Sequence, residues 1–515
     1  MNKAKKILAL ILSVLMLLSM VACSGDNGGQ TGNTGATIKL KFVAADFGYG
    51  TGWLKAIAQA YMAKNRNVSI TVENTPIPHQ LISQIEGGLD TYDIVFGTSG
   101  DMGDLGEKGV FVNIDDVYAS VPNGGTATVA EKLGTMAGMM EYKGHYYSVP
   151  YVSSPVGMVV NNDTMRALYG ENYTLPNTTD EFMTLAKDIK SKGAYAFIDS
   201  IGYTDYLIET WWSQYDPEGV KNYWNATYTD ENGETKLATN GESLNQPGKL
   251  LALQLAETLL LPKNGYNHAY VGQMDFAQAQ LAFLGQGFSG IDNKKVAFMP
   301  NGAWLENEME LVLEEYPADF TMFRVPVISA IINVLPDKSV ADDAELSALI
   351  SAIDAGSTAL SGNDYEVTQA DFNRVANARY ATSQNSTAHA AAICASSKNV
   401  DACKDFLTFM ASDEASAIAA RVLKGVTLPY GYMPSAGNGY EISKYVASAN
   451  ALSVNAIYIG ADNTAPTLNG LTFSKMIGSA LCDALRNGNK TAQEIYDSDY
   501  ASFKNDWKYI IAGMQ

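Results

Sequence analysis

The sequence predicts an α/β protein of two lobes, and three observations support this prediction. After residue 36, strand-like and helix-like runs alternate along the chain, which is typical of an open α/β domain with a parallel sheet. Roughly 480 residues remain for the fold, enough for two domains with separate cores. Between the two halves, residues 142–160 form two strand-like runs that are broken at Pro150 and Pro155. Because proline removes a ladder hydrogen bond and permits a bend, we expect a strand that leaves one sheet and enters another.

The first 36 residues predict an export signal and a tether. Residues 1–22 carry three lysines and then an apolar run that is too short for a confident membrane span. Residues 20–23, Met-Val-Ala-Cys, resemble the bacterial lipobox, which implies that Cys23 becomes the lipidated first residue of the mature chain. An ordinary secretory signal and a transmembrane anchor are the alternatives. Residues 23–36 are rich in Gly, Asn, Ser and Thr and are expected to form a flexible tether.

Composition restricts the class of partner. The apolar content of 47% and the charged content of 17% are typical of a globular protein rather than a disordered one. The net charge of −20 argues against nucleic acid or an anionic lipid surface as a partner. Beyond Cys23, only Cys394, Cys403 and Cys482 remain, which is no disulfide framework. Two alternatives stay open: one disulfide between two of these cysteines, or three buried thiols.

The first half begins with a predicted βαβ unit. Residues 37–45 and 68–73 have strand patterns, and residues 53–64 between them have helical spacing of apolar side chains. The other elements expected in this half are helices at 79–87 and 102–107 and a strand at 92–96. Ligands of such sheets bind beyond the carboxyl ends of the strands, where residues 46–53 and 97–101 would lie.

The glycine-rich turn from Gly48 to Trp53 allows three interpretations. A dinucleotide-binding turn would need a third glycine where Trp53 stands, so the motif fails at that position. The turn is then either a tight structural turn or a place where Tyr49 and Trp53 overhang a ligand cleft. Both of these alternatives stay open.

The second half repeats the alternation of strands and helices. Thr178 is expected to cap a helix that runs to Ser191. The other expected elements are strands at 195–201 and 295–299, helices at 206–215, 247–261 and 275–284, and a hairpin at 228–236. Within 206–215 we expect Trp211 and Trp212 to lie in the core.

Several segments carry a resemblance to a known family. They are residues 142–150, 277–283, 294–304, 395–407 and 489–507. In this order, behind a lipobox, they resemble the extracellular solute-binding proteins of carbohydrate ABC importers, the family typified by the maltose-binding protein. The resemblance covers nearly all of the mature chain.

The resemblance implies a periplasmic-binding-protein-like fold of type II, a Venus flytrap whose chain crosses three times between the lobes. It places lobe 1 at residues 37–150 and 321–411, with a surface insertion at 356–386. Lobe 2 would comprise residues 151–320 and 412–515. The implied function is capture of a sugar or oligosaccharide and delivery to an ABC permease, without chemical change and without a cofactor or metal. The protein would be lipid-anchored at the extracellular face of the membrane.

The ligand site is expected in the cleft between the lobes. Sugar rings offer apolar faces and hydroxyl groups, so their sites combine flat aromatic side chains with polar ones. Trp304 matches the stacking tryptophan of the family, and Tyr203 matches another stacking aromatic. Ser154 stands where the maltose-binding protein has a glutamate, which indicates a changed ligand. The residues predicted to bind the ligand are Trp304, Tyr203, Asp101, Ser154, Tyr151, Tyr49, Trp53 and Ser99.

Other functions stay open. The four histidines are scattered without metal-ligand spacing, and residues 97–101 and 287–291 lack the second glycine of a nucleophile elbow. Paired carboxylates of a glycoside hydrolase could still meet in space. A lipoprotein adhesin and a binder of a solute other than sugar are the remaining alternatives.

Overall fold

The computed structural model describes most of the chain after residue 36. The described residues are 37–45, 48–75, 83–88, 92–97, 102–152, 155–199, 203–286, 294–359, 367–384, 389–435, 439–460 and 479–512. The chain divides into Met1–Thr37 and a second unit, Ile38–Gln515, which holds both sheets described below. The predicted signal, Cys23 and the tether lie outside the described residues. In the part of the chain that the structure describes, no helix is long and apolar enough to cross a membrane.

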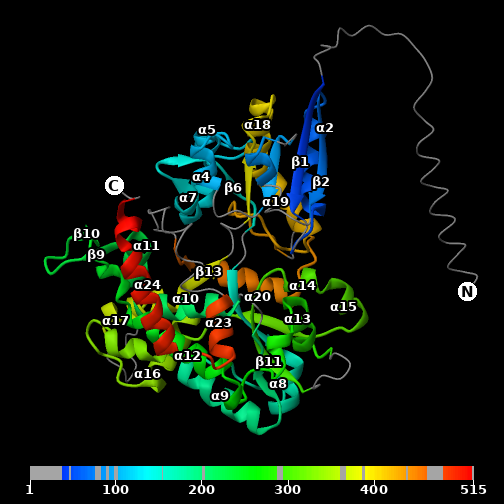
Figure 1. Cartoon of the computed structure of the whole chain (residues 1–515). Helices are drawn as coiled ribbons and strands as arrows, with labels where there is room; N and C mark the ends of the chain where they lie inside the picture. The colour runs from blue at the N-terminus through cyan, green and yellow to red at the C-terminus, as the bar shows by residue number, and fades with distance from the viewer. Residues whose placement is uncertain are drawn as a thin grey trace, which may run out of the picture. The chain divides into compact units, whose positions relative to one another are not determined.

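A five-stranded sheet forms the centre of the first lobe. Its order is β2-β1-β3-β14-β6, with β1 at Ile38–Ala45, β2 at Val68–Thr75, β3 at Ile94–Gly97, β6 at Val149–Pro150 and β14 at Ala390–Ile393. Strand β1 pairs in parallel with β2 and β3, and helix α2 (Gly52–Lys64) connects β1 to β2, so the predicted βαβ unit is confirmed. Figure 1 shows these three elements side by side in blue. The buried face of α2 carries Trp53, Ile57 and Tyr61 at the spacing of one helical turn.

The remaining described elements of the first lobe surround this sheet. They are α4 (Met102–Glu107), α5 (Asp115–Ala119), α6 (Val129–Leu133), α7 (Thr135–Met140), the hairpin of β4 (Glu141–Tyr142) and β5 (His145–Tyr146), α18 (Val400–Met410) and α19 (Asp413–Val422). Helix α19 lies against α2, and Ala415 and Ala419 share one hydrophobic core with Trp53.

A six-stranded sheet forms the centre of the second lobe. Its order is β15-β13-β7-β11-β8, and β12 also pairs with β7. The strands are β7 (Pro155–Asn161), β8 (Tyr195–Phe197), β11 (Val296–Gly302), β12 (Phe320–Phe323), β13 (Ala381–Gln384) and β15 (Ile457–Tyr458). Strand β7 is buried along its whole length, as expected for a central strand covered on both faces. At Gly157 an added Cβ would lie 2.7 Å from Leu452 and 3.0 Å from the Phe323 carbonyl oxygen, so only glycine fits there.

The second lobe also contains most of the described helices. They are α8 (Asn162–Tyr169), α9 (Thr179–Ser191), α10 (Thr204–Tyr215), α11 (Pro217–Asn225), α12 (Pro247–Leu260), α13 (Phe276–Phe283), α14 (Leu305–Glu308), α15 (Glu310–Glu315), α16 (Asp343–Asp354), α17 (Gln369–Tyr380), α20 (Lys444–Ser453), α23 (Ser479–Arg486) and α24 (Ala492–Ala512). A hairpin of β9 (Thr227–Thr229) and β10 (Thr235–Leu237) and the 3-10 helices η1 (Glu242–Leu244), η2 (Pro262–Asn264), η3 (Val271–Gln273) and η4 (Ser329–Val334) connect them. Figure 1 shows the red α24 beside the green α12, which it contacts although the two are far apart in the sequence.

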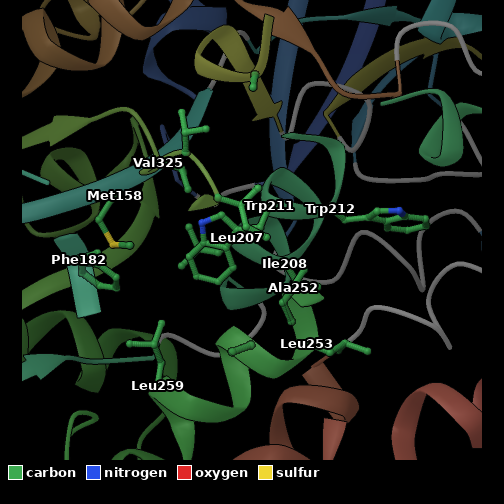
Figure 2. Packing of buried hydrophobic residues seen from close by; sticks show 14 of the residues in the cluster. Met158, Phe182, Leu207, Ile208, Trp211, Trp212, Ala252, Leu253, Leu259 and Val325 are labelled. Atoms are coloured by element: carbon green, nitrogen blue, oxygen red, sulfur yellow. The ribbon is translucent and has the colours of Figure 1, made fainter. Parts of the chain in front are cut away.

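The core of the second lobe is centred on α10. Trp211 and Trp212 are fully buried, which confirms their predicted place in the core. Figure 2 shows both side chains in this cluster together with Ala252 and Leu253 of α12. The predicted cap of α9 is also confirmed, because the Thr178 side chain accepts a hydrogen bond from the Glu181 backbone N–H.

The proline-broken run changes sheets as predicted. Strand β6 ends at Pro150 in the first sheet, and β7 begins at Pro155 in the second. Between them, the Tyr151 backbone N–H donates to the His389 carbonyl at 3.1 Å, which ties this connection to the segment that enters β14.

The assignment of residues 321–411 to lobe 1 was wrong for most of that range. Strand β12 pairs with β7 from Phe320 opposite Asn161 to Phe323 opposite Met158, and α16 and α17 contribute to the same core as Trp211. The chain joins the first sheet only between the end of β13 and the start of β14. The proposed surface insertion at 356–386 is likewise corrected, since β13 pairs with β7 and Phe372 of α17 is buried in the second core.

The assignment of residues 412–515 to lobe 2 needs a smaller correction. Helix α19 belongs to the core of the first lobe, and α20 is the first later helix that packs on the second sheet, against β12 and β7. The apolar face of α19 is complementary to α2, and such a pairing cannot be read from the pattern of either helix alone. The three cysteines in the described part of the chain, Cys394, Cys403 and Cys482, are all buried free thiols, so the alternative of a disulfide is not realised.

Candidate functional site

Trp304 lies where β11 ends. The ring folds back over the strand so closely that a Cβ added at Gly302 would lie 2.2 Å from it, which makes glycine necessary at that position. The Gly302 carbonyl accepts a hydrogen bond from the Tyr445 hydroxyl at 2.6 Å, which fixes the end of the strand against α20. The Trp304 indole N–H donates to the Tyr203 hydroxyl at 3.0 Å, and the two rings lie 5.8 Å apart. The structure therefore brings together the two aromatic residues that the sequence predicts for stacking.

The glycine-rich turn of the first lobe meets this aromatic pair. Gly48 has a φ of +59°, and a Cβ added there would lie 3.7 Å from the Cβ of Trp304. The pKa of Tyr203 is raised above its ordinary value, mainly by burial, and the nearby Glu308 carboxylate and Tyr49 hydroxyl also raise it. Tyr49, Tyr203 and Trp304 thus form one cluster with contributions from both lobes, at the carboxyl ends of β1 and β11.

Trp53 and Tyr151 are not brought to this cluster. Their rings stack on each other at 5.3 Å with an interplanar angle of 23°, and Phe96 meets both edge-on. Only 3% of Trp53 and 6% of Tyr151 are exposed, and both belong to the core of the first lobe. The Trp53 indole N–H donates to the Gly50 carbonyl at 3.1 Å, so this tryptophan supports the turn from inside.

Three further predicted residues lie outside the described part of the chain. They are Ser99, Asp101 and Ser154. Among the described residues, the Glu308 carboxylate lies near Tyr203. The Gln280 side-chain amide donates to the Glu308 carboxylate at 2.7 Å, and burial raises the pKa of Glu308.

Helix α10 adds another polar group that the sequence analysis missed. Tyr206 lies 6.2 Å from Tyr203 between ring centres, and Glu209 follows one turn later and accepts a hydrogen bond from Ser383 of β13 at 3.2 Å. The spacing of three between Tyr203, Tyr206 and Glu209 is the signal that could have identified this helix face. Burial raises the pKa of Glu209 to about 7, whereas the Ser383 hydrogen bond lowers it.

The raised pKa of Glu209 predicts that the stability of the protein depends on pH. Its folded-state pKa of about 7 exceeds the ordinary glutamate pKa of 4.5, so between these pH values the folded protein holds a proton that the unfolded chain has lost. The contribution of Glu209 to stability must therefore fall as the pH rises through this window, by about 2 kcal/mol between about pH 5 and 7.5. Glu209→Gln is expected to remove that fall, measured as the free energy of unfolding in urea at several pH values. The exposed Glu218→Gln variant of α11 should keep the wild-type slope, and parallel profiles for both variants would contradict the assignment.

The arrangement suits recognition of a polar ligand that has an apolar face. Flat aromatic rings can cover the C–H face of a ring, and carboxylates and amides can accept or donate hydrogen bonds to hydroxyl groups. Among the described residues, no group of three or more His, Cys, Asp or Glu side chains is placed to hold a metal ion.

Comparison with known proteins gives a family and a fold. Residues 44–417 match the family model described as bacterial extracellular solute-binding protein. The diacetylchitobiose binding protein NgcE of Streptomyces coelicolor (strain ATCC BAA-471 / A3(2) / M145) is 24% identical over 319 residues, which cover 59% of this chain and 61% of that protein. This chain therefore spans about three fifths of the length of that relative.

Two solved structures share the fold. The solute-binding protein RafE in complex with raffinose has a TM-score of 0.58 and 16% identity, covering 92% of this chain and all of the other. The GacH receptor of Streptomyces glaucescens GLA.O, solved unliganded and with acarbose, has a TM-score of 0.59 and 15% identity, covering 92% of this chain and 98% of the other. The predicted α/β fold of two lobes is confirmed by this likeness. Because the family model matches well over half of the chain, the protein belongs to the bacterial extracellular solute-binding proteins.

Proposed function

We propose that this protein captures a sugar or oligosaccharide outside the cell membrane and delivers it to an ABC permease without chemical change. The observation that carries the proposal is the hydrogen-bonded pair of Trp304 and Tyr203 at the carboxyl end of β11, next to the Gly48 turn of the other lobe. Aromatic faces with carboxylate and amide groups beside them are what a sugar ring requires. The names of the relatives support the same ligand class, since they give diacetylchitobiose, raffinose and acarbose.

The proposed mechanism is an exchange between open and closed arrangements of the lobes. A ligand that contacts both lobes stabilises the closed arrangement, because only there are all its contacts made. Trp304 is only 4% exposed in the structure, with Tyr203 on one side and Gly48 near its Cβ. A ligand reaches the indole face only when these neighbours move away from it.

The proposed location follows from the family and from the start of the sequence. The lipobox-like residues 20–23 support cleavage and lipidation at Cys23, and residues 24–36 would then tether the protein at the extracellular face of the membrane. Labelling with a radioactive fatty acid in the native host should mark the wild-type protein and leave Cys23→Ser unlabelled.

The ligand class is tested by titrating the purified mature protein with raffinose, acarbose and diacetylchitobiose in a calorimeter. Heat of binding with the sugar recovered intact is the expected result. Cleaved sugar would overturn the proposal in favour of a hydrolase, and binding of a solute that is not a sugar, with none of the sugars, would replace the ligand class. The absence of a response to any small solute would favour an adhesin.

Trp304→Ala should weaken sugar binding by about 1–3 kcal/mol, because the stacking face and its buried apolar area are lost. Affinity is measured by the same calorimetric titration, and a thermal unfolding curve verifies that the variant is folded. Tyr316→Ala removes a half-exposed aromatic of the same lobe and should leave the affinity unchanged. Wild-type affinity in Trp304→Ala would remove this residue from the site.

A further inference from the structure

A cavity of the second lobe lies along strand β8. Strands β8 and β11 are parallel, with Tyr195 and Lys294 at their amino ends and Tyr203 and Trp304 beyond their carboxyl ends. Asn267 and Arg486 of the cavity wall contact Asp199, which follows β8, and neither Tyr203 nor Trp304 is among the described residues that line the cavity. The cavity has a volume of about 580 Å³, which is within the usual range for small-molecule sites.

Asn267 lines this cavity and has a buried donor without a partner. Its side-chain oxygen accepts hydrogen bonds from the backbone N–H groups of Asp199 at 3.0 Å and His268 at 2.9 Å. Because two donors hold the oxygen, the orientation of the amide is fixed and its NH₂ group points the other way. That nitrogen is buried and has no hydrogen-bond partner, and only 5% of the residue is exposed. A buried donor of this kind is stabilised when a ligand supplies an acceptor.

Arg486 presents a second unused donor. One of its terminal nitrogens pairs with the Asp199 carboxylate, and the other donates to Asp483 at 2.6 Å. Its Nε–H is buried without a hydrogen-bond partner, and the residue is 6% exposed. Gly272 lies beside the Arg486 side chain, so the segment that carries Asn267 and the end of α23 form adjoining walls of the cavity.

Two lysines line the cavity. Lys190 lies along the wall, where its ammonium group donates to the Asn264 carbonyl at 2.7 Å and lies over the Tyr266 ring. The Lys294 ammonium group lies 5.3 Å from the centre of the Tyr195 ring. Among the described residues that line the cavity there is no Asp or Glu, although the chain as a whole carries a net charge of −20.

We propose that this cavity is a second ligand site, for a small organic anion with a carboxylate or phosphate group. Both nitrogens are buried in the structure, so part of the wall moves before the oxygens of the anion accept hydrogen bonds from Asn267 Nδ2 and Arg486 Nε. The two lysines supply positive charge. Leu260, Pro262 and Val271 form an apolar part of the wall that suits the carbon skeleton of the ligand. The site is separate from the sugar site and does not depend on the function proposed for Trp304.

The probes for this site are glucuronate and glucose 6-phosphate, with neutral glucose as the matched control. Each is titrated calorimetrically into the wild-type mature protein, Trp304→Ala and the double variant Lys190→Gln/Lys294→Gln. We expect one of the two anions to bind the wild-type protein and Trp304→Ala equally. In the double variant its affinity should fall by about tenfold or more, since two charge-assisted interactions are lost.

Asn267→Asp is the sharpest variant, because it keeps the oxygen that accepts the two backbone hydrogen bonds and replaces the donor by a negative charge. It should abolish anion binding while sugar binding at Trp304 persists. If this variant fails to fold, the proposal is tested by the lysine variant and by the expected loss of anion affinity when salt is added. The proposal would be overturned if neither anion binds the wild-type protein at about millimolar concentration. It would also be overturned if Trp304→Ala abolishes anion binding while the lysine variant leaves anion binding unchanged. A failed sugar titration alone would overturn only the function proposed for Trp304.

Discussion

Trp211→Ala is expected to lower the free energy of unfolding by about 3–5 kcal/mol, the usual cost of removing a large aromatic from a core. Trp211 is fully buried among the helices of the second lobe, and its indole N–H donates to the Pro326 carbonyl at 3.2 Å. The substitution removes apolar contacts on all sides and leaves that buried carbonyl without its donor. Urea denaturation followed by far-ultraviolet circular dichroism measures the loss.

Two matched variants test this explanation. Trp211→Phe keeps most of the ring volume and should cost less than the alanine variant, because a smaller cavity is left. Tyr509→Ala removes an aromatic side chain that is 69% exposed on α24 and should change stability by no more than about 0.5 kcal/mol. A loss for Trp211→Ala as small as that for Tyr509→Ala would mean that this cluster does not determine the stability of the lobe.

Arg486→Met should destabilise the protein by a similar amount, about 3–5 kcal/mol, because it leaves a buried carboxylate without its cation. The side chains of Asp199 and Arg486 are 1% and 6% exposed, and their ion pair joins α23 to the segment after β8. Burial raises the pKa of Asp199, and the positive charge of Arg486 opposes this rise. Removal of the arginine raises the pKa of Asp199 further. The stability lost is therefore greatest at neutral and higher pH and shrinks as the pH falls and the carboxyl becomes protonated.

The controls separate the buried pair from its exposed neighbour. Asp483→Asn affects a side chain that is 51% exposed and should cost at most about 1 kcal/mol. The double variant Asp199→Asn/Arg486→Met removes both charges and should recover part of the stability that Arg486→Met loses. Equal stability for Arg486→Met and its double variant at pH 7 would show that the loss does not come from an unpaired charge.

Local elements of this fold could be predicted because local patterns determine them. The βαβ unit of residues 38–75, the cap at Thr178 and the burial of Trp211 and Trp212 follow from alternation, capping chemistry and helical spacing. The motif ending at Trp304 also led to a contact that the structure contains, the indole hydrogen bond to Tyr203.

The partners of these elements could not be predicted in the same way. The apolar run at β12 has the pattern of a strand, but only its pairing with β7 decides that it belongs to the second sheet. The apolar faces of α17 and α19 likewise do not indicate the lobe on which each helix packs. Trp53 and Tyr151 illustrate the same limit, since an aromatic beside a turn can face a ligand or stack in a core.

Local sequence patterns were sufficient to predict the βαβ unit of residues 38–75, the cap of α9, the change of sheets between Pro150 and Pro155, and the aromatic residue that follows β11. These depend on periodicity and on residues close together in the chain. Three outcomes required the folded chain: which lobe holds residues 320–384, which side chains join Trp304, and that Asn267 and Arg486 line one cavity. Those outcomes depend on contacts between segments distant in sequence, where the free energy comes from complementary surfaces that no single segment contains.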